Sequence, residues 1–185
     1  MPGCARRSNA GMSGTASDPA PYRLRSITPQ DPVDLTRFYA GLSPDSRAAR
    51  FHGAAPSIPE ATAKFFCGPD HEHREGIVAE SLDEGGHPVI IGHVCIEPIN
   101  NDVAEMAIAV ADAWQRRGVG RAMLAKAIDW ARLHGISGLL ASMRSDNTAV
   151  SSLVRSMGYP IRYGAPDGGT VDALIEVRGS HPVAA

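Results

Sequence analysis

The chain has 185 residues and a formal net charge of −2, with 18 Lys and Arg against 20 Asp and Glu. This balance excludes a strongly basic protein that binds nucleic acid through bulk charge, although it does not exclude a local basic patch. Hydrophobic residues make up 43% of the chain, which is enough for one buried core at this length. The sequence has no run of 18 apolar residues and therefore no predicted membrane span.

The N-terminal segment and the cysteines also indicate how the chain is organised. Residues 1–20 are rich in Gly, Ser, Ala and Pro and lack the apolar segment of a secretory signal. Such a segment cannot offset the entropy cost of ordering, so we expect a disordered tail followed by one folded domain over residues 21–180. The widely spaced Cys4, Cys67 and Cys95 predict reduced thiols in a cytoplasmic protein rather than a disulfide framework or a metal site.

Apolar periodicity divides the folded part into alternating strands and helices. The predicted strands cover residues 22–27, 75–81, 89–97, 103–110, 139–143, 162–163 and 171–177. The first predicted helix begins after Asp31, a candidate N-terminal cap, and the others cover residues 44–51, 59–67, 117–134 and 148–157. This order predicts a three-layered mixed α/β sheet and differs from a regular βαβ repeat.

The segment with the most chemical information joins the strand ending at Val110 to the long helix. Residues 112–121 read Asp-Ala-Trp-Gln-Arg-Arg-Gly-Val-Gly-Arg. A helix start has unpaired N–H groups and a positive partial charge, and glycines allow a phosphate to approach the backbone closely. A diphosphate site is therefore predicted here, and tight packing without a ligand is the alternative. A dinucleotide motif is excluded because Met123 stands in place of its third glycine, and no Walker A loop is present.

At this point the sequence resembles a known family. Residues 115–120 resemble the Q/R-x-x-G-x-G/A motif of the Gcn5-related N-acetyltransferases (GNAT), and Asp146-Asn147 with Gly158-Tyr159 resembles the family's D-N…G-F/Y segment. The similarity covers about residues 22–178. It implies an α/β fold with a mixed, mostly antiparallel sheet, splayed between two central parallel strands and covered by helices on both faces. Acetyl-CoA would lie between the splayed strands, here residues 103–110 and 139–143.

The resemblance also implies which residues hold the cofactor. The backbone of Ile108, Ala109 and Val110 would bond the pantetheine arm, and the N–H at about Val110 would polarise the thioester carbonyl. Asn147 would lie at or near the pantetheine; a plain helix N-cap is the alternative, and both roles can coexist. The backbone N–H groups that would hold the pyrophosphate belong to Arg116, Arg117, Gly118, Val119, Gly120 and Arg121.

The candidate catalytic residue is Glu105. Lysine has a reference pKa of about 10.4, so acetyl transfer near neutral pH needs a base or a water relay. Glu105 shares one face of its strand with Ala107 and Ala109, which indicates a surface left open for a substrate. A solvent-facing glutamate on an uncovered sheet face is the alternative. The A-E-x-A-x-x-V strand resembles that of bacterial protein lysine acetyltransferases, which implies a general base at this position.

Two further segments bear on the acceptor and on the leaving thiolate. Residues 42–51 are similar to the L-S-x-x-S-x-x-x-R-F stretch of that subgroup, where it lies near the acceptor side. A capped helix with a solvated Arg50 is the simpler interpretation. Many family members place a tyrosine acid seven residues after the asparagine, but this chain has Val154 there. The thiolate would then leave unprotonated or take its proton from water or another group.

These residues predict an acetyl-CoA-dependent N-acetyltransferase acting by direct attack of a primary amine. The favoured acceptor is a protein lysine ε-amine. The alternatives are a small amine (a polyamine, an amino acid or an antibiotic) and a non-catalytic acyl-CoA sensor. We expect no metal, since the polar run 70–73 (Asp-His-Glu-His) is typical of a solvated loop, and no nucleic-acid or membrane partner. Either a monomer or a homodimer is expected.

Overall fold

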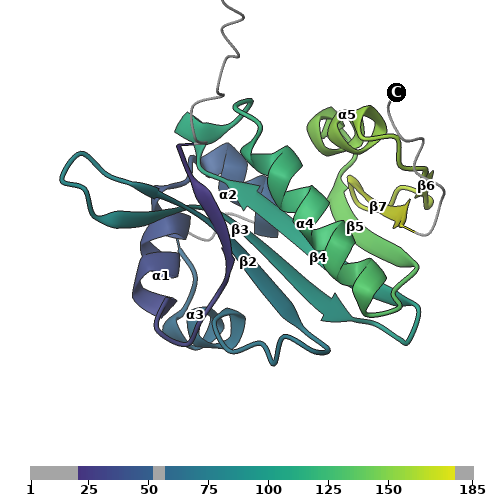
Figure 1. Ribbon diagram of the computed structural model, residues 1–185. Helices are drawn as coiled ribbons and strands as arrows, with labels where there is room; N and C mark the ends of the chain where they lie inside the picture. Colours follow the sequence, from purple (N-terminus) through teal and green to yellow (C-terminus); the bar gives the residue numbers. More distant parts are fainter. Residues whose placement is uncertain (1–20, 52–56, 178–185) are drawn as a thin grey trace, which may run out of the picture.

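The computed structural model describes residues 21–51 and 57–177 (Figure 1). The predicted tail over residues 1–20 and the last residues of the predicted domain, 178–180, lie outside this part. The elements follow the expected order, with one added 3₁₀ turn: β1 (Arg23–Ser26), α1 (Pro32–Gly41), α2 (Pro44–Phe51), α3 (Glu60–Phe66), β2 (Glu75–Leu82), β3 (Pro88–Pro98), β4 (Val103–Val110), η1 (Asp112–Trp114), α4 (Val119–Leu133), β5 (Gly138–Arg144), α5 (Thr148–Ser156), β6 (Ile161–Tyr163) and β7 (Thr170–Glu176).

The strands form one sheet in the order β1-β2-β3-β4-β5-β7-β6. All neighbouring strands are antiparallel except β4 and β5, which are parallel. Their ladder has only three pairs, from Val103 with Gly138 to Glu105 with Leu140, and the two strands separate beyond it. The predicted splay between two central parallel strands is therefore confirmed.

Helices cover both faces of the sheet, as predicted (Figure 1). On one face α4 buries an apolar stripe that includes Met123, Leu124 and Ile128 against the sheet. On the other face α1 and α3 enclose a second core, in which Leu35 and Tyr39 are fully buried. Because alternate residues of a strand face opposite sides, β4 contributes to both cores and positions residues on both of them.

The first helix shows one difference from prediction. Asp31 stands at the N-cap position, but its carboxylate makes no bond to the helix. It accepts hydrogen bonds from the Thr28 N–H at 2.7 Å and from both terminal nitrogens of Arg25 at 2.8 Å. Pro32 at the first turn needs no N–H partner, so the helix begins without a side-chain cap. The Asp31 side chain instead ties β1 to the start of α1.

The start of α4 also differs from the predicted helix over 117–134. The helix begins at Val119, because Arg116 and Gly118 adopt positive φ angles of 57° and 85°. These left-handed residues form a turn that reverses the chain between η1 and the helix. The predicted C-terminal stop at Gly135 is confirmed, with a φ of 76° and an N–H bond to the Arg132 carbonyl.

Candidate active site

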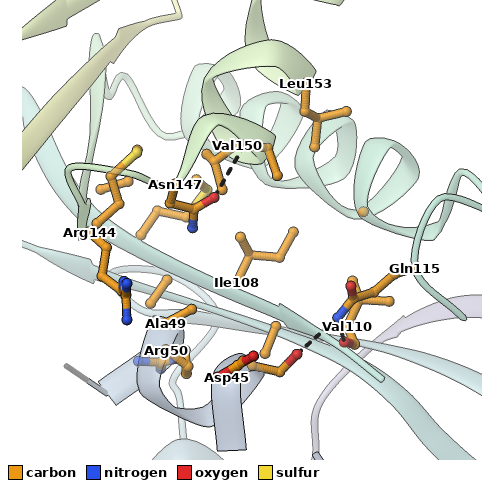
Figure 2. A pocket seen from close by; sticks show the side chains of 18 of the residues that line it. Asp45, Ala49, Arg50, Ile108, Val110, Gln115, Arg144, Asn147, Val150 and Leu153 are labelled. Carbon is orange, nitrogen blue, oxygen red and sulfur yellow. Dashed lines mark hydrogen bonds between the residues drawn. The ribbon is translucent and has the colours of Figure 1, made fainter. Parts of the chain in front are cut away.

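A cavity of about 690 Å³ opens where β4 and β5 separate. Its walls come from β4, β5, the turn before α4, the first half of α5 and one side of α2 (Figure 2). The volume lies within the range of small-molecule sites, roughly 300–1,000 Å³.

The edge of β4 presents main-chain groups to this cavity. The Ala111 N–H donates to the Ile91 carbonyl of β3 at 2.8 Å. Successive residues of a strand point their N–H groups to opposite edges, so those of Ile108 and Val110 point away from β3, toward the split. Ile108, Ala109 and Val110 all line the cavity. By the same alternation the N–H of Ala109 faces β3, so main-chain contact with a cofactor falls to Ile108 and Val110.

The turn before α4 forms one end of the cavity. The first bond within the helix runs from the Ala122 N–H to the Gly118 carbonyl at 3.0 Å, so the N–H groups of residues 119–121 precede it. A Cβ at Gly118 would meet no atom within 4 Å, and one at Gly120 would lie 3.7 Å from Val110 and 3.8 Å from Leu153. Both glycines therefore leave space beside the helix N-terminus, which suits an anionic group.

The predicted pyrophosphate residues do not all line the cavity. Those that line it are Arg116, Gly118, Gly120 and Arg121. Arg117 instead lies over the Trp114 ring, with its guanidinium carbon 5.5 Å from the ring centroid. Val119 is fully buried in the core beside α4. Their side chains are thus turned away from the cavity, and the main-chain role expected for both stays a prediction.

The start of α5 forms the opposite wall. Asn147 is the N-cap of this helix, and its Oδ1 accepts a hydrogen bond from the Ala149 N–H at 3.2 Å (Figure 2). The N-cap interpretation is confirmed, and the residue also lines the cavity, as the second interpretation requires. Val154, at the place where many relatives have a tyrosine, is fully buried in the core. It offers no proton to a leaving thiolate.

Glu105 lies where the sheet divides. It belongs to the last pair of the β4–β5 ladder, opposite Leu140, and its side chain is exposed. It does not itself line the cavity, although Met106 and Ala107, the next residues, do. Its charge acts on Arg50, whose pKa it helps to raise. The carboxylate therefore lies on the face of the sheet that α2 covers, at the inner end of the cavity.

The α2 wall brings in residues that the sequence analysis did not assign to the site: Asp45, Ser46, Ala49 and Arg50. The similarity of residues 42–51 to an acceptor-side segment was the signal for them. The expectation that Arg50 is solvated is wrong. The side chain is half-buried, its Nε is fully buried, and its Nη2 donates to Cys95 Sγ at 3.1 Å. The neighbouring Phe51 and Phe66 rings withdraw it from water.

A hydrogen-bond network joins α2 to the turn before α4. Asp112 accepts bonds from the Ser43 N–H at 2.8 Å and from the hydroxyls of Ser43 and Ser46, both at 2.7 Å. The Gln115 amide donates to Ser46 Oγ at 3.0 Å and to the Val110 carbonyl at 3.1 Å (Figure 2). Burial alone would raise the pKa of Asp112, but these hydrogen bonds outweigh it and lower the pKa. The carboxylate thus fixes α2 relative to the end of β4.

A buried polar pair lies beneath the α2 wall. The imidazole of His93 is fully buried, and its Nδ1 shares a hydrogen bond with the Tyr39 hydroxyl at 2.8 Å. Burial, with a contribution from the Arg50 charge, lowers the pKa of His93 to about 3. The ring is therefore neutral at physiological pH. In the tautomer with an unprotonated Nδ1, the Tyr39 hydroxyl donates the shared hydrogen bond. His93 supports the wall and carries no charge at neutral pH.

The structure adds two findings on other classes of site. The residues that it describes contain no group of three His, Cys, Asp or Glu side chains arranged to hold a metal ion. His71, in the predicted solvated loop, bonds Glu75 through Nδ1 at 2.8 Å. Within residues 21–51 and 57–177, no helix combines the length and the apolar character needed to cross a bilayer.

A split mixed sheet with an open cavity, glycines at a helix N-terminus and main-chain N–H groups facing the split suit an extended ligand with an anionic end. Comparison with known proteins identifies the family. The model of the acetyltransferase (GNAT) family matches residues 37–159, and the chain belongs to this family. It is an acetyl-CoA-dependent N-acetyltransferase, as predicted, and acetyl-CoA is its cosubstrate.

Solved structures agree with this assignment. The GNAT domain of S. lividans PAT has 28% identity and a TM-score of 0.74, and the match covers 84% of this chain and 90% of that domain. YncA of Salmonella typhimurium, an acetyltransferase solved with acetyl-CoA, has 18% identity, a TM-score of 0.64 and coverages of 89% and 99%. A phosphinothricin acetyltransferase of Sinorhizobium meliloti in complex with acetyl-CoA also has 18% identity and a TM-score of 0.64, with coverages of 84% and 88%. The last two share the fold.

Proposed function

We propose that this enzyme transfers the acetyl group of acetyl-CoA to the ε-amine of a protein lysine, with Glu105 as the general base. The observation that carries the proposal is the position of Glu105. Its exposed carboxylate lies at the last pair of the β4–β5 ladder, next to the inner end of the cavity. A long lysine side chain on a protein surface can reach such a carboxylate, whereas a closed pocket would favour a small amine.

The cavity provides a consistent path for the donor. The diphosphate binds at the α4 N-terminus through main-chain N–H groups of residues 116–121. The pantetheine arm runs along the β4 edge past Val110 and Ile108, near Asn147. The thioester then lies beyond Ile108, toward Ala107 and Met106, so the N–H that polarises its carbonyl is that of Ile108 rather than the more distant one of Val110. The neutral amine attacks the carbonyl carbon directly, its proton passes to Glu105, and the CoA thiolate leaves as the tetrahedral intermediate collapses.

The similarity to the GNAT domain of the S. lividans protein acetyltransferase (PAT) also supports a protein acceptor, since the similarity extends over most of both chains. The alternative acceptor is a small amine, and the alternative class is a non-catalytic acyl-CoA sensor. A cytoplasmic location suits the proposal, because the described cysteines, Cys67 and Cys95, are free buried thiols. Whether the enzyme works as a monomer or as a homodimer does not alter these steps.

The test is transfer from labelled acetyl-CoA to proteins of a cell lysate, with the wild type and the Glu105→Gln variant. We expect label on protein lysines, reduced about 10²- to 10⁴-fold in the variant because the base is lost. Since the side chain is exposed, the substitution leaves the fold intact. Exposed Glu84, in the β2–β3 turn, provides a matched Glu84→Gln control that keeps full activity.

Three results would contradict the proposal in different ways. Label on small molecules alone would identify a small-amine acetyltransferase. Acetyl-CoA binding without any transfer would support the sensor. Full activity of the Glu105→Gln variant on protein lysines would support the lysine acceptor and exclude Glu105 as the general base. Mass spectrometry of the labelled fraction distinguishes these outcomes in one experiment.

A further inference from the structure

The cavity wall contains a cation that the diphosphate site does not account for. Arg116 and Arg121 lie at the α4 N-terminus, where the diphosphate is expected. Arg50 comes from α2 and reaches Cys95, which is paired across the sheet with Ala107. Ala107 precedes the end of β4 by three residues, about 10 Å at roughly 3.3 Å per residue. The Arg50 guanidinium therefore lies near the expected position of the thioester rather than near the phosphates.

The described groups that accept from Arg50 are uncharged, namely the Cys95 sulfur and the Tyr39 hydroxyl. Its Nη2 donates to a thiol sulfur, and its Nε is buried with no hydrogen-bond partner among the described residues. No carboxylate in residues 21–51 or 57–177 forms an ion pair with it. Phe51 and Phe66 lie against it, with ring centroids 4.9 Å and 5.6 Å from the guanidinium carbon. Arg144, which lines the cavity at the end of β5, is already paired with Asp146 at 2.6 Å.

A guanidinium in such surroundings favours an anionic ligand. Arginine stays charged in proteins, and withdrawing the charge from water without an ionic partner is unfavourable. Its planar fork matches the two oxygens of a carboxylate, which it binds through two parallel hydrogen bonds. Glu105 lies two residues from Ala107 on the same face of β4, and Ala107 is paired with the Cys95 that Arg50 contacts. A carboxylate bound by Arg50 would therefore lie beside an amine presented to Glu105.

We propose that Arg50 binds a carboxylate of the acceptor, next to the amine that receives the acetyl group. This inference rests on the proposed function, under which the acceptor is a protein lysine, and it defines the preferred acceptor as a lysine flanked by Asp or Glu. A carboxylate on the acyl group would present the same chemistry from the donor side. The two sources differ in the substrate that carries the charge, so matched substrates separate them.

The experiment measures kcat/KM for two lysine peptides that differ only in a Glu or a Gln beside the acceptor, with acetyl-CoA as donor. The wild type is expected to prefer the Glu peptide by about tenfold or more, as a charge-assisted bidentate contact provides. In Arg50→Gln the ratio falls to near one, and in Arg50→Lys it is retained in part. The ratio is independent of the folded fraction, because both peptides are measured with the same preparation.

Two further substrate pairs make every result decisive. In the first, 5-aminopentanoate and 5-aminopentanamide replace the peptides. In the second, the acyl donors malonyl-CoA and isovaleryl-CoA, which are nearly isosteric, are compared on the Gln peptide. A preference for the charged acceptor that Arg50→Gln abolishes supports the proposal in either acceptor pair. A preference confined to malonyl-CoA overturns it in favour of the acyl group.

The two proposals fail in different ways. If the wild type acetylates both peptides equally and shows no preference between the small amines, the Arg50 assignment is overturned while the lysine acceptor stands. If neither peptide is acetylated but 5-aminopentanoate is preferred, the lysine acceptor is wrong and the carboxylate site is supported. If Arg50→Gln lowers kcat/KM for all substrates by one common factor, Arg50 is a structural residue of α2, and the assignment is also overturned.

Discussion

At the scale of single residues, His93 illustrates how burial determines protonation. Its imidazole lies between Tyr39 and the Phe66 ring, fully withdrawn from water, and the positive charge of Arg50 opposes a second charge nearby. The pKa therefore falls from 6.5 to about 3. In the unfolded chain the ring is hydrated and regains its ordinary pKa. Folding and proton binding at this residue are consequently linked.

The direction of the linkage follows from the two pKa values. Between pH 6.5 and pH 3 the unfolded chain binds a proton at His93 that the folded chain does not bind. The contribution is complete above pH 6.5 and is lost as the pH falls, by about 2 kcal/mol between pH 7 and pH 5. Urea denaturation at these two pH values measures it. The His93→Gln variant keeps a hydrogen-bonding partner for Tyr39. Its free energy of unfolding should fall by about 2 kcal/mol less than that of the wild type between pH 7 and pH 5. An equal fall in both proteins would refute the assignment.

At the scale of elements, the relation between α2 and the end of β4 depends on Asp112. Its carboxylate accepts three hydrogen bonds from Ser43 and Ser46, while Gln115 continues the network to the Val110 carbonyl. One wall of the cavity is thereby fixed to the turn that begins α4. Since α2 carries residues proposed to face the acceptor and the turn faces the expected diphosphate, this contact fixes one proposed binding region relative to the other.

Replacing Asp112 by Asn should impair the use of both substrates, acetyl-CoA and the acceptor. The amide keeps the shape but loses the charge and part of the acceptor capacity, which costs about 1–3 kcal/mol in charge-assisted bonds. We expect kcat/KM to fall roughly tenfold for acetyl-CoA and for the acceptor alike, and the melting temperature to fall by about 2–10 °C. Steady-state kinetics with each substrate varied tests this. Asp34→Asn, which removes an exposed carboxylate from α1, is the matched control, and an effect on one substrate alone would contradict the expected coupling.

At the scale of the whole molecule, the sheet consists of two parts whose strands pair only through a short ladder. Strands β1 to β4 form one part and β5, β7 and β6 the other, joined by the three-pair ladder and by the packing of α4. A ligand in the cavity contacts both parts, because Ile108 lies on one side and Asn147 on the other. Acetyl-CoA should therefore add contacts across the split that the protein alone lacks.

Acetyl-CoA at 100 times its Kd should stabilise the fold by about 2.7 kcal/mol. For a chain of this length, that corresponds to a rise in Tm of about 5–10 °C. Differential scanning fluorimetry with increasing acetyl-CoA measures the rise. Gly120→Leu places a large side chain between Val110 and Leu153 and should remove most of it. A rise of equal size in this variant would mean that the cofactor binds elsewhere.

Much of this architecture was accessible from sequence, because local patterns determine it. The β4 strand was predicted at its observed bounds, and the Gly118-Val119-Gly120 turn indicated a phosphate site where the cavity has one end. The α4 start was predicted two residues early, because positive φ at Arg116 leaves no compositional signal. The burial of Arg50 was missed for a different reason. It depends on Phe66, Cys95 and the packing of α2, and these are contacts between distant segments.

The alternation along β4 separates two kinds of molecular recognition within one strand. Ile108 and Val110 offer peptide N–H groups to the cleft, and every residue type except proline carries the same group. Glu105 and Ala107 offer side chains on the α2 face, and these differ with every substitution. With acetyl-CoA held by these main-chain groups, as proposed above, evolution can exchange the acceptor by altering a few side chains. A lineage that starts from this chain can acquire a new substrate without an intermediate that has lost its hold on acetyl-CoA.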